Sequence, residues 1–258
     1  MELNLDLSAF NPIRVPKVKL VHLLLDPGHP EDIPQDMWYR RMEIQAESIR
    51  SWHIIAKRLG SYSQRFNRIN RTELPVENCA DPSIIVTDKN FRGDGLSYGH
   101  YGAYLAHRNA ILEEFDADTD AILIVEGDTQ LNIDPVKMHH EIISAYDFAS
   151  KNNGAMFTFG DVKFGLNHLS DEMVKDSGRY NKIPHFLCAH CYMILSTEKE
   201  RIREKILGSK WHAWDIWLYW NYDHDKSVNI FSTKTPLVFE PDGVSMIDYQ
   251  NKPNNLKG

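Results

Sequence analysis

The sequence has few cysteines, no recognisable leader and no apolar run long enough to span a membrane. Three cysteines in 258 residues are an odd and sparse number, which favours a reducing compartment over a disulfide framework. The first 19 residues lack a cationic start followed by an apolar core, so they do not resemble a signal peptide. No stretch approaches the roughly 20 apolar residues that a transmembrane helix needs. These absences predict a cytoplasmic protein, and peripheral attachment to a membrane stays open.

The sequence also lacks an excess of positive charge. The 29 basic residues face 36 acidic ones, for a net charge of −7, and no block of lysine or arginine occurs. This balance disfavours non-specific nucleic-acid binding. No repeat, low-complexity tract or Gly/Ser linker divides the chain. We therefore expect an irregular lead-in over residues 1–17 and one domain over residues 18–258, which is long enough to bury a substantial core.

Two apolar runs dominate what is present. Residues 18–25 (VKLVHLLL) and 121–125 (AILIV) are typical of strands buried on both faces. The other predicted strands are residues 155–159 and 186–195, with shorter pieces at 62–69 and 84–87. Periodicity and capping residues predict helices at residues 36–59, 100–115, 135–150 and 197–208. This alternation predicts an α/β fold, with a mostly parallel sheet covered by helices on both faces and ligands at the carboxyl ends of its strands.

Local signals set several of these boundaries. Asp26-Pro27-Gly28 ends the first strand, and Gly60 closes the first helix. Asp134 and Pro135 suit the N-cap and first helical position of the third. Residues 197–200 (TEKE) form a capping-box pattern. The polar, glycine-containing segment between residues 159 and 186 is predicted to be a loop over a site.

The acidic step Glu126-Gly127-Asp128 follows the AILIV strand directly. A strand buried on both faces excludes carboxylates, so both acids must emerge at its carboxyl end, and residues two apart in an extended chain point the same way. Converging carboxylates repel unless a cation lies between them, and Mg²⁺ or Mn²⁺ prefers oxygen ligands. Gly127 would leave room for a ligand's close approach. The alternative is an ordinary acidic turn at a strand end.

Residues 96–131 carry a family resemblance. LSYGHYGAYLAHRNAI followed by AILIVEGDTQL resembles glycosyltransferase family 25, the lipopolysaccharide-type glycosyltransferases, with their G-x-x-L-S-H helix and an apolar strand ending in E-D-D. Gly102, Leu105, His107, Glu126 and Asp128 match that pattern. Ala106 and Gly127 depart from it, where the family has serine and an acid.

Later segments resemble the same family in the same order. They are HCYMILS at residues 190–196, WDIWL at 214–218, PLV at 236–238 and SMI at 245–247. The resemblance implies a Rossmann-like GT-A fold, a nucleoside-diphosphate sugar as donor (UDP-linked in our expectation), a saccharide or glycolipid acceptor, and inversion at the anomeric carbon. It also implies donor binding by Asp26, His107 and the Glu126-Gly127-Asp128 step.

The chemistry expected of such an enzyme suggests roles for particular residues. Glu126 and Asp128 would hold Mn²⁺ or Mg²⁺, which neutralises the departing diphosphate. His224 or His190 would complete the metal shell. Asp215 is the candidate general base, because its aromatic surroundings would raise its pKa. The alternative for Asp215 is the N-cap of a short helix.

Three groups of side chains have competing interpretations. Arg40 and Arg41 could bind phosphate or belong to a solvated helix face. Trp214 and Trp217 could form the floor of an acceptor site, although core packing is commoner for such residues. The cysteines at residues 188 and 191 lack the second ligand pair that zinc needs, so buried thiols explain them better.

Two other functional classes compete with the glycosyltransferase. A nucleotidyltransferase would need a glycine-rich, basic phosphate loop after the first strand, and His29-Pro30-Glu31-Asp32 does not fit. A non-catalytic domain that binds a sugar or a partner is favoured by the missing acid at Gly127.

Overall fold

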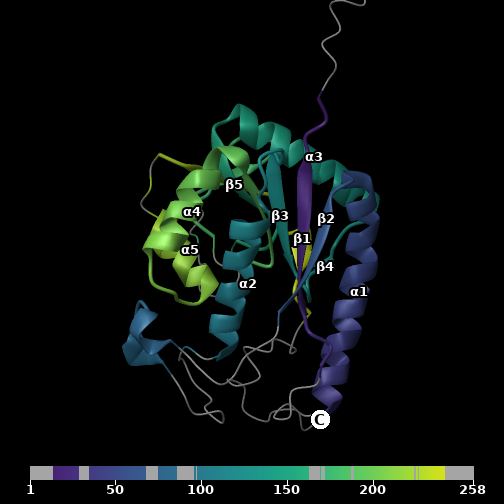
Figure 1. The fold of residues 1–258 in the computed structure, drawn as a ribbon. Coiled ribbons are helices and arrows are strands. Elements are labelled where there is room, and N and C mark those ends of the chain that lie inside the picture. Colours follow the sequence, from purple (N-terminus) through teal and green to yellow (C-terminus); the bar gives the residue numbers. More distant parts are fainter. Residues whose placement is uncertain are drawn as a thin grey trace, which may run out of the picture.

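The computed structural model describes residues 14–28, 35–67, 75–85, 96, 98–162, 169, 172–186, 189–223, 225 and 227–241. These residues form an eight-stranded sheet of order β2-β1-β3-β8-β5-β9-β7-β6, with helices packed against it (Figure 1). No helix within these ranges is both long and apolar enough to cross a membrane. His224, Cys188 and residues 29–34 lie outside the described residues.

The strands of the main sheet are β1 (Val18–Leu25), β2 (Tyr62–Asn67), β3 (Ala121–Glu126), β5 (Gly154–Thr158), β6 (Lys175–Asp176), β7 (Asn181–Ile183), β8 (Cys191–Leu195) and β9 (Asn229–Ser232). A small second sheet pairs β4 (Gln130–Leu131) antiparallel with β10 (Val238–Phe239). The α-helices are α1 (Gln35–Leu59), α2 (Tyr98–Glu114), α3 (Pro135–Lys151), α4 (Lys199–Gly208) and α5 (Trp214–Tyr222). Single 3₁₀ turns are η2 (Val76–Asn78), η3 (Pro82–Ile84) and η5 (Ser196–Glu198).

Most strands of the main sheet run in one direction. β1 is parallel to β2 and to β3, and β5 is parallel to β9. β8 lies between β3 and β5 and is antiparallel to both, so β3 and β5 share a direction. β7 also reverses, against both β9 and β6. The predicted α/β fold with a mostly parallel sheet is confirmed. The sequence patterns did not reveal that β8 and β7 run against the rest.

Alternating side chains of the strands belong to two separate hydrophobic cores, one on each face of the sheet. One face of the sheet packs against α2, α4 and α5, and the other packs against α1 and α3. Figure 1 shows α2, α4 and α5 together on one side and α1 on the other. In β3, Ile122 and Ile124 point to the first core, while Leu123 and Val125 point to the second. This period of two in a wholly buried strand confirms that AILIV is covered on both faces.

The ends of the helices test the predicted boundary signals. Gly60 has φ +71°, the left-handed conformation expected just after a helix. The Asp134 carboxylate accepts hydrogen bonds from the backbone N–H groups of Val136 and Lys137, which confirms the predicted N-cap. The predicted capping box is wrong, because α4 begins at Lys199 and no side chain caps it. Thr197 instead donates to the Gly154 carbonyl.

Two further predictions about segments need correction. The strand predicted over residues 186–195 is shorter, because β8 starts at Cys191. The segment between residues 159 and 186 was predicted as a loop, but it includes β6 and β7 at the edge of the sheet. β7 pairs with β9, so this part of the segment extends the sheet.

Candidate functional site

The turn after β3 is firmly anchored. The Thr129 N–H donates to the Glu126 carbonyl at 3.0 Å, which closes the turn. The Thr129 hydroxyl donates to the His190 carbonyl at 2.9 Å. From α1, Ser48 Oγ and Trp52 Nε1 both donate to the Thr129 carbonyl, at 2.9 and 3.1 Å. The acids of the step are therefore presented from a rigid backbone at the carboxyl end of a buried strand.

Gly127 is required by packing inside the protein. A Cβ at this position would lie 2.8 Å from Gln45 Oε1 and 3.0 Å from the Leu23 carbonyl oxygen. Gln45 is held there by Leu25, whose N–H donates to Oε1 at 2.7 Å and whose carbonyl accepts from Nε2 at 3.0 Å. The space expected to admit a ligand is occupied by Gln45. A side chain would not fit at this position, so close packing accounts for the glycine between the two acids.

Glu126 is held by two histidines from different elements. Its Oε1 lies 2.8 Å from His107 Nε2, and its Oε2 lies 3.2 Å from His190 Nδ1. Burial alone would raise the pKa of Glu126, but the hydrogen bonds from both histidines hold it well below its usual range. Glu126 is therefore ionised at neutral pH, with its carboxylate fixed in place.

Asp128 points into a buried ion pair. Its Oδ2 lies 2.6 Å from an Arg41 guanidinium nitrogen, and the two side chains are only 4% and 10% exposed. The other oxygen, Oδ1, is buried and has no hydrogen-bond partner among the described residues. Arg41 was predicted either to bind phosphate or to lie on a solvated helix face, and the second alternative is wrong. Arg40 beside it is exposed.

Glu240 is a site residue that our reading of the sequence did not identify. β10 pairs with β4 so that Phe239 faces Gln130, which brings Glu240 beside the turn that carries Asp128. Its Oε2 lies 3.6 Å from His190 Nε2. Burial, and then the negative charge of Asp128, raise the pKa of Glu240 to about 8. The available signal was an acid directly after the apolar residues 236–239, the region of the family-like PLV segment.

Asp215 lies in the first turn of α5, close to the same acids. Its Oδ1 accepts a hydrogen bond from the Ala189 N–H at 3.1 Å. Burial, and then the negative charge of Glu126, raise the pKa of Asp215. The N-cap of α5 is Ala213, so the alternative that Asp215 caps this helix is wrong. Asp215 thus joins the group from a position 89 residues beyond Glu126 in the chain.

The remaining candidates occupy different positions. Asp26 follows β1, is partly exposed, and accepts from the Gly28 N–H at 2.9 Å. His107 is 1% exposed and both its ring nitrogens are engaged, so it reaches a ligand only through Glu126. Trp214 and Trp217 are 3% and 1% exposed, so the acceptor-floor interpretation of these two rings is wrong. Cys191 is a buried free thiol, as predicted.

The structure therefore brings four carboxylates from three separate segments to one end of the sheet. They are Glu126, Asp128, Asp215 and Glu240, and they lie with His107, His190 and Arg41. Within the described part of the chain, no group of three His, Cys, Asp or Glu side chains is arranged to hold a metal ion. The carboxylates still offer oxygen ligands for a hard cation, because Asp128 Oδ1 is buried without a hydrogen bond among the described residues and Glu240 lies near enough to feel the negative charge of Asp128.

Comparison with known proteins adds little to this picture. No protein-family model matches the chain, so its resemblance to glycosyltransferase family 25 is not confirmed. No curated protein matches it either. A similar solved structure is apo mouse xyloside xylosyltransferase 1, with 10% sequence identity and a TM-score of 0.35 over 78% of this chain and 80% of that one. This likeness is too slight to carry a functional assignment.

Proposed function

We propose that this chain is a metal-assisted glycosyltransferase that moves a sugar from a UDP-linked or similar nucleoside-diphosphate donor to a hydroxyl of a saccharide or glycolipid. The observation that carries the proposal is Asp128 Oδ1, which is buried beside Glu126 and Glu240 without a hydrogen-bond partner among the described residues. Such an oxygen is costly unless something binds it. A cation would bind it and would also relieve the repulsion between the acids.

Asp128 and Glu240 are the residues proposed to hold the cation, with Glu126 beside them. Mg²⁺ sites of this kind use one or two protein carboxylates and take their other ligands from water and substrate phosphates. When bound, the cation would neutralise the departing diphosphate as a Lewis acid. His224, predicted from the sequence as a further ligand, stays a prediction.

Asp215 is proposed to take the proton from the acceptor. In the reaction, the acceptor oxygen bonds to the anomeric carbon while the bond from that carbon to the diphosphate oxygen breaks, and the diphosphate keeps the electron pair. The acceptor's hydroxyl proton passes to the Asp215 carboxylate. Attack from the side opposite the leaving group inverts the anomeric carbon, as the family resemblance implies. A raised pKa suits this role, because it makes the carboxylate a better base.

One observation favours a second candidate, a sugar- or partner-binding domain without transferase activity. Arg41 already neutralises Asp128 through a contact of 2.6 Å, so a fixed protein cation stands where a metal would otherwise supply the charge. Detection of transfer, or of hydrolysis of a nucleotide sugar, would decide against this candidate.

The proposed function is tested by titrating UDP into the protein calorimetrically, with Mn²⁺ and again with EDTA. We expect binding with Mn²⁺, and binding weakened roughly tenfold or more in EDTA, the scale typical of disturbed metal sites. The variant Glu240→Gln keeps the Arg41–Asp128 pair and should lose most of the metal dependence. Asp118→Asn is the control, because the Asp118 side chain is 85% exposed on the surface.

Asp128→Asn tests the same site more directly and is expected to abolish metal-dependent binding. It also leaves Arg41 as a buried charge without Asp128, so thermal unfolding must be recorded alongside. If the protein binds none of UDP, GDP and CMP, both with Mn²⁺ and with EDTA, the proposed function is wrong. Unchanged metal dependence in a folded Asp128→Asn protein would remove Asp128 as a ligand.

A further inference from the structure

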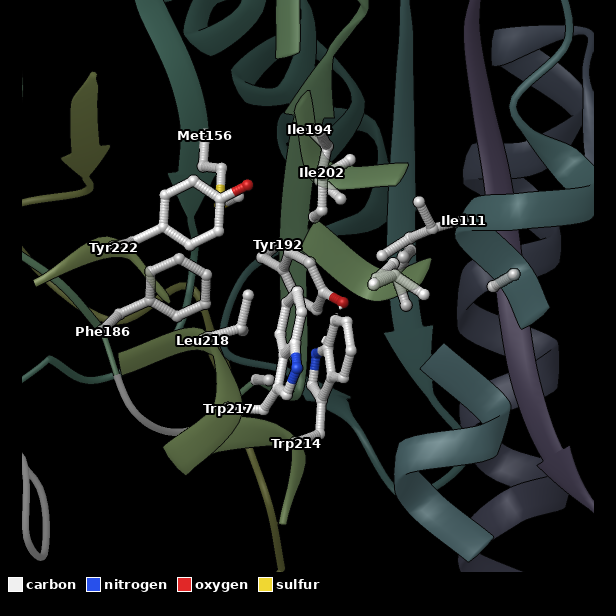
Figure 2. Close-up of a cluster of buried hydrophobic side chains, with 14 of the residues drawn as sticks. Ile111, Met156, Phe186, Tyr192, Ile194, Ile202, Trp214, Trp217, Leu218 and Tyr222 are labelled. Atoms are coloured by element: carbon white, nitrogen blue, oxygen red, sulfur yellow. Dashed lines mark hydrogen bonds between the residues drawn. The ribbon is translucent and has the colours of Figure 1, made fainter. Parts of the chain in front are cut away.

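A chain of buried hydrogen bonds runs from α5 through β8 and α2 to Glu126. Trp214 Nε1 lies 2.9 Å from Tyr192 Oη, which lies 2.9 Å from His107 Nδ1. His107 Nε2 in turn lies 2.8 Å from Glu126 Oε1. The three ring side chains are 3%, 0% and 1% exposed. Figure 2 shows the Tyr192 hydroxyl directed toward Trp214 within the aromatic cluster.

The direction of each hydrogen bond follows from the chemistry of the groups. An indole N–H only donates, so the Tyr192 oxygen accepts from Trp214. Tyr192 must then direct its own hydrogen to an acceptor, because a buried hydroxyl hydrogen without one is costly. The acceptor found among the described residues is His107 Nδ1. His107 therefore carries its hydrogen on Nε2, where it donates to the Glu126 carboxylate.

Ring packing holds the His107 imidazole in the plane that its two hydrogen bonds require. The His107 ring stacks on Trp214 with an interplanar angle of 5° and a centroid distance of 5.2 Å. It also stacks on Tyr192 at 24° and 5.7 Å. A hydrogen on Nδ1 would oppose two donors at Tyr192 and leave Glu126 Oε1 facing a bare nitrogen, and a flip of the ring would turn C–H groups toward both partners. Both the tautomer and the orientation of His107 are thus determined by residues from other elements.

We propose that Tyr192 and Trp214 are positioning residues, which hold His107 as its Nε2–H tautomer and through it fix the Glu126 carboxylate in the site. Both side chains are buried, and their hydrogen bonds lead to Glu126 through His107. The effect of this positioning on turnover rests on the proposed function, because Glu126 matters for transfer only if the site binds a nucleotide sugar. The tautomer of His107 does not depend on any function.

The first test is ¹⁵N NMR of the histidine-labelled protein, with the His107 resonances assigned by their loss in His107→Asn. We expect one protonated nitrogen, Nε2, and one unprotonated nitrogen, Nδ1. A hydrogen on Nδ1, or on both nitrogens, near neutral pH would overturn the proposal. This measurement needs no variant of Tyr192 and no activity.

The second test compares Tyr192→Phe with Tyr222→Phe. Tyr222 lies in the same apolar cluster (Figure 2), and its buried hydroxyl donates to Glu198 Oε1 at 3.0 Å. Both variants delete one buried hydroxyl, but only Tyr192 connects to Glu126. We expect Tyr192→Phe to give mixed His107 tautomers and transfer lowered about 10- to 100-fold, the range for residues that orient a site from behind. Tyr222→Phe should leave both unchanged.

The outcomes separate the two proposals. The expected tautomer in a wild-type protein that neither binds nor transfers nucleotide sugars would support the positioning role and defeat the proposed function. An unchanged His107 tautomer in a folded Tyr192→Phe protein would overturn the positioning role, whatever the activity. If Tyr192→Phe does not fold, Trp214→Phe removes the first donor while keeping an aromatic ring. The ¹⁵N spectrum of that variant then provides the test, and an unchanged His107 tautomer would overturn the positioning role.

Discussion

Gly127→Ala should destabilise the protein, because the added methyl group has nowhere to go. The new Cβ would lie 2.8 Å from Gln45 Oε1 and 3.0 Å from the carbonyl oxygen of Leu23, which belongs to the buried strand β1 and cannot retreat. Overpacking of this kind costs about 1–3 kcal/mol. Displacing Gln45 would also weaken its two hydrogen bonds to Leu25, each worth about 0.5–1.5 kcal/mol.

Together these effects predict a loss of about 2–6 kcal/mol in the free energy of unfolding. For a chain of this size, at about 2–4 °C per kcal/mol, the loss corresponds to a fall of roughly 4–24 °C in the melting temperature, measured by calorimetry or circular dichroism. Gly208→Ala is the matched control, since a Cβ at that helix end meets nothing within 4 Å. We expect the control to change stability by less than about 1 kcal/mol.

A double variant, Gly127→Ala with Gln45→Ala, isolates the side-chain clash. Removing Gln45 relieves the 2.8 Å contact and leaves the 3.0 Å approach to the Leu23 carbonyl oxygen. The two substitutions should therefore destabilise the protein by less than the sum of their separate effects. A melting temperature unaffected by Gly127→Ala, or strictly additive effects, would refute this account of why a glycine stands between the two acids.

Two further predictions concern the acids of the site. Asp215→Asn should retain UDP binding while transfer falls by roughly 10²–10⁴-fold, the usual contribution of a general base, and normal turnover in this variant would remove Asp215 as the base. Glu240 has a folded-state pKa of about 8, above the ordinary value for a glutamate, so the folded state binds more protons than the unfolded state between about pH 4.5 and 8. Its contribution to stability is therefore present at low pH and is lost as pH rises through that window. Glu240→Gln should flatten this decline in urea denaturation from pH 5 to 8, and an unchanged slope would contradict the raised pKa.

Much of the fold could be predicted from local patterns. The apolar runs of β1 and β3 identified the buried centre of the sheet, because near-continuous apolar runs are typical of strands covered on both faces. Asp134 and Pro135 located the start of α3, since capping depends on neighbouring backbone groups alone. The capping box predicted from the TEKE pattern at residues 197–200 is wrong, because a contact with a distant segment replaces the local one. η5 precedes α4, and Thr197 bonds to Gly154, a residue distant in the sequence.

The candidate site was predictable only in part. Glu126 and Asp128 could be placed at the end of β3, because burial excludes charge from the strand itself. Glu240 and Arg41 carried no comparable signal. Glu240 reaches the site through the pairing of β10 with β4, and Arg41 reaches it from the buried side of α1. Such contacts depend on how separate elements pack, which a local pattern does not encode.

By itself, the sequence determined that two largely apolar strands anchor an α/β sheet and that acids emerge where one of them ends, since hydrophobic burial and capping act over a few residues. Only the tertiary structure decided the reversed direction of β8, the glycine forced by Gln45 and the meeting of four carboxylates at one edge. Each of these depends on contacts between segments far apart in the chain, where strand pairing and close packing set the distances.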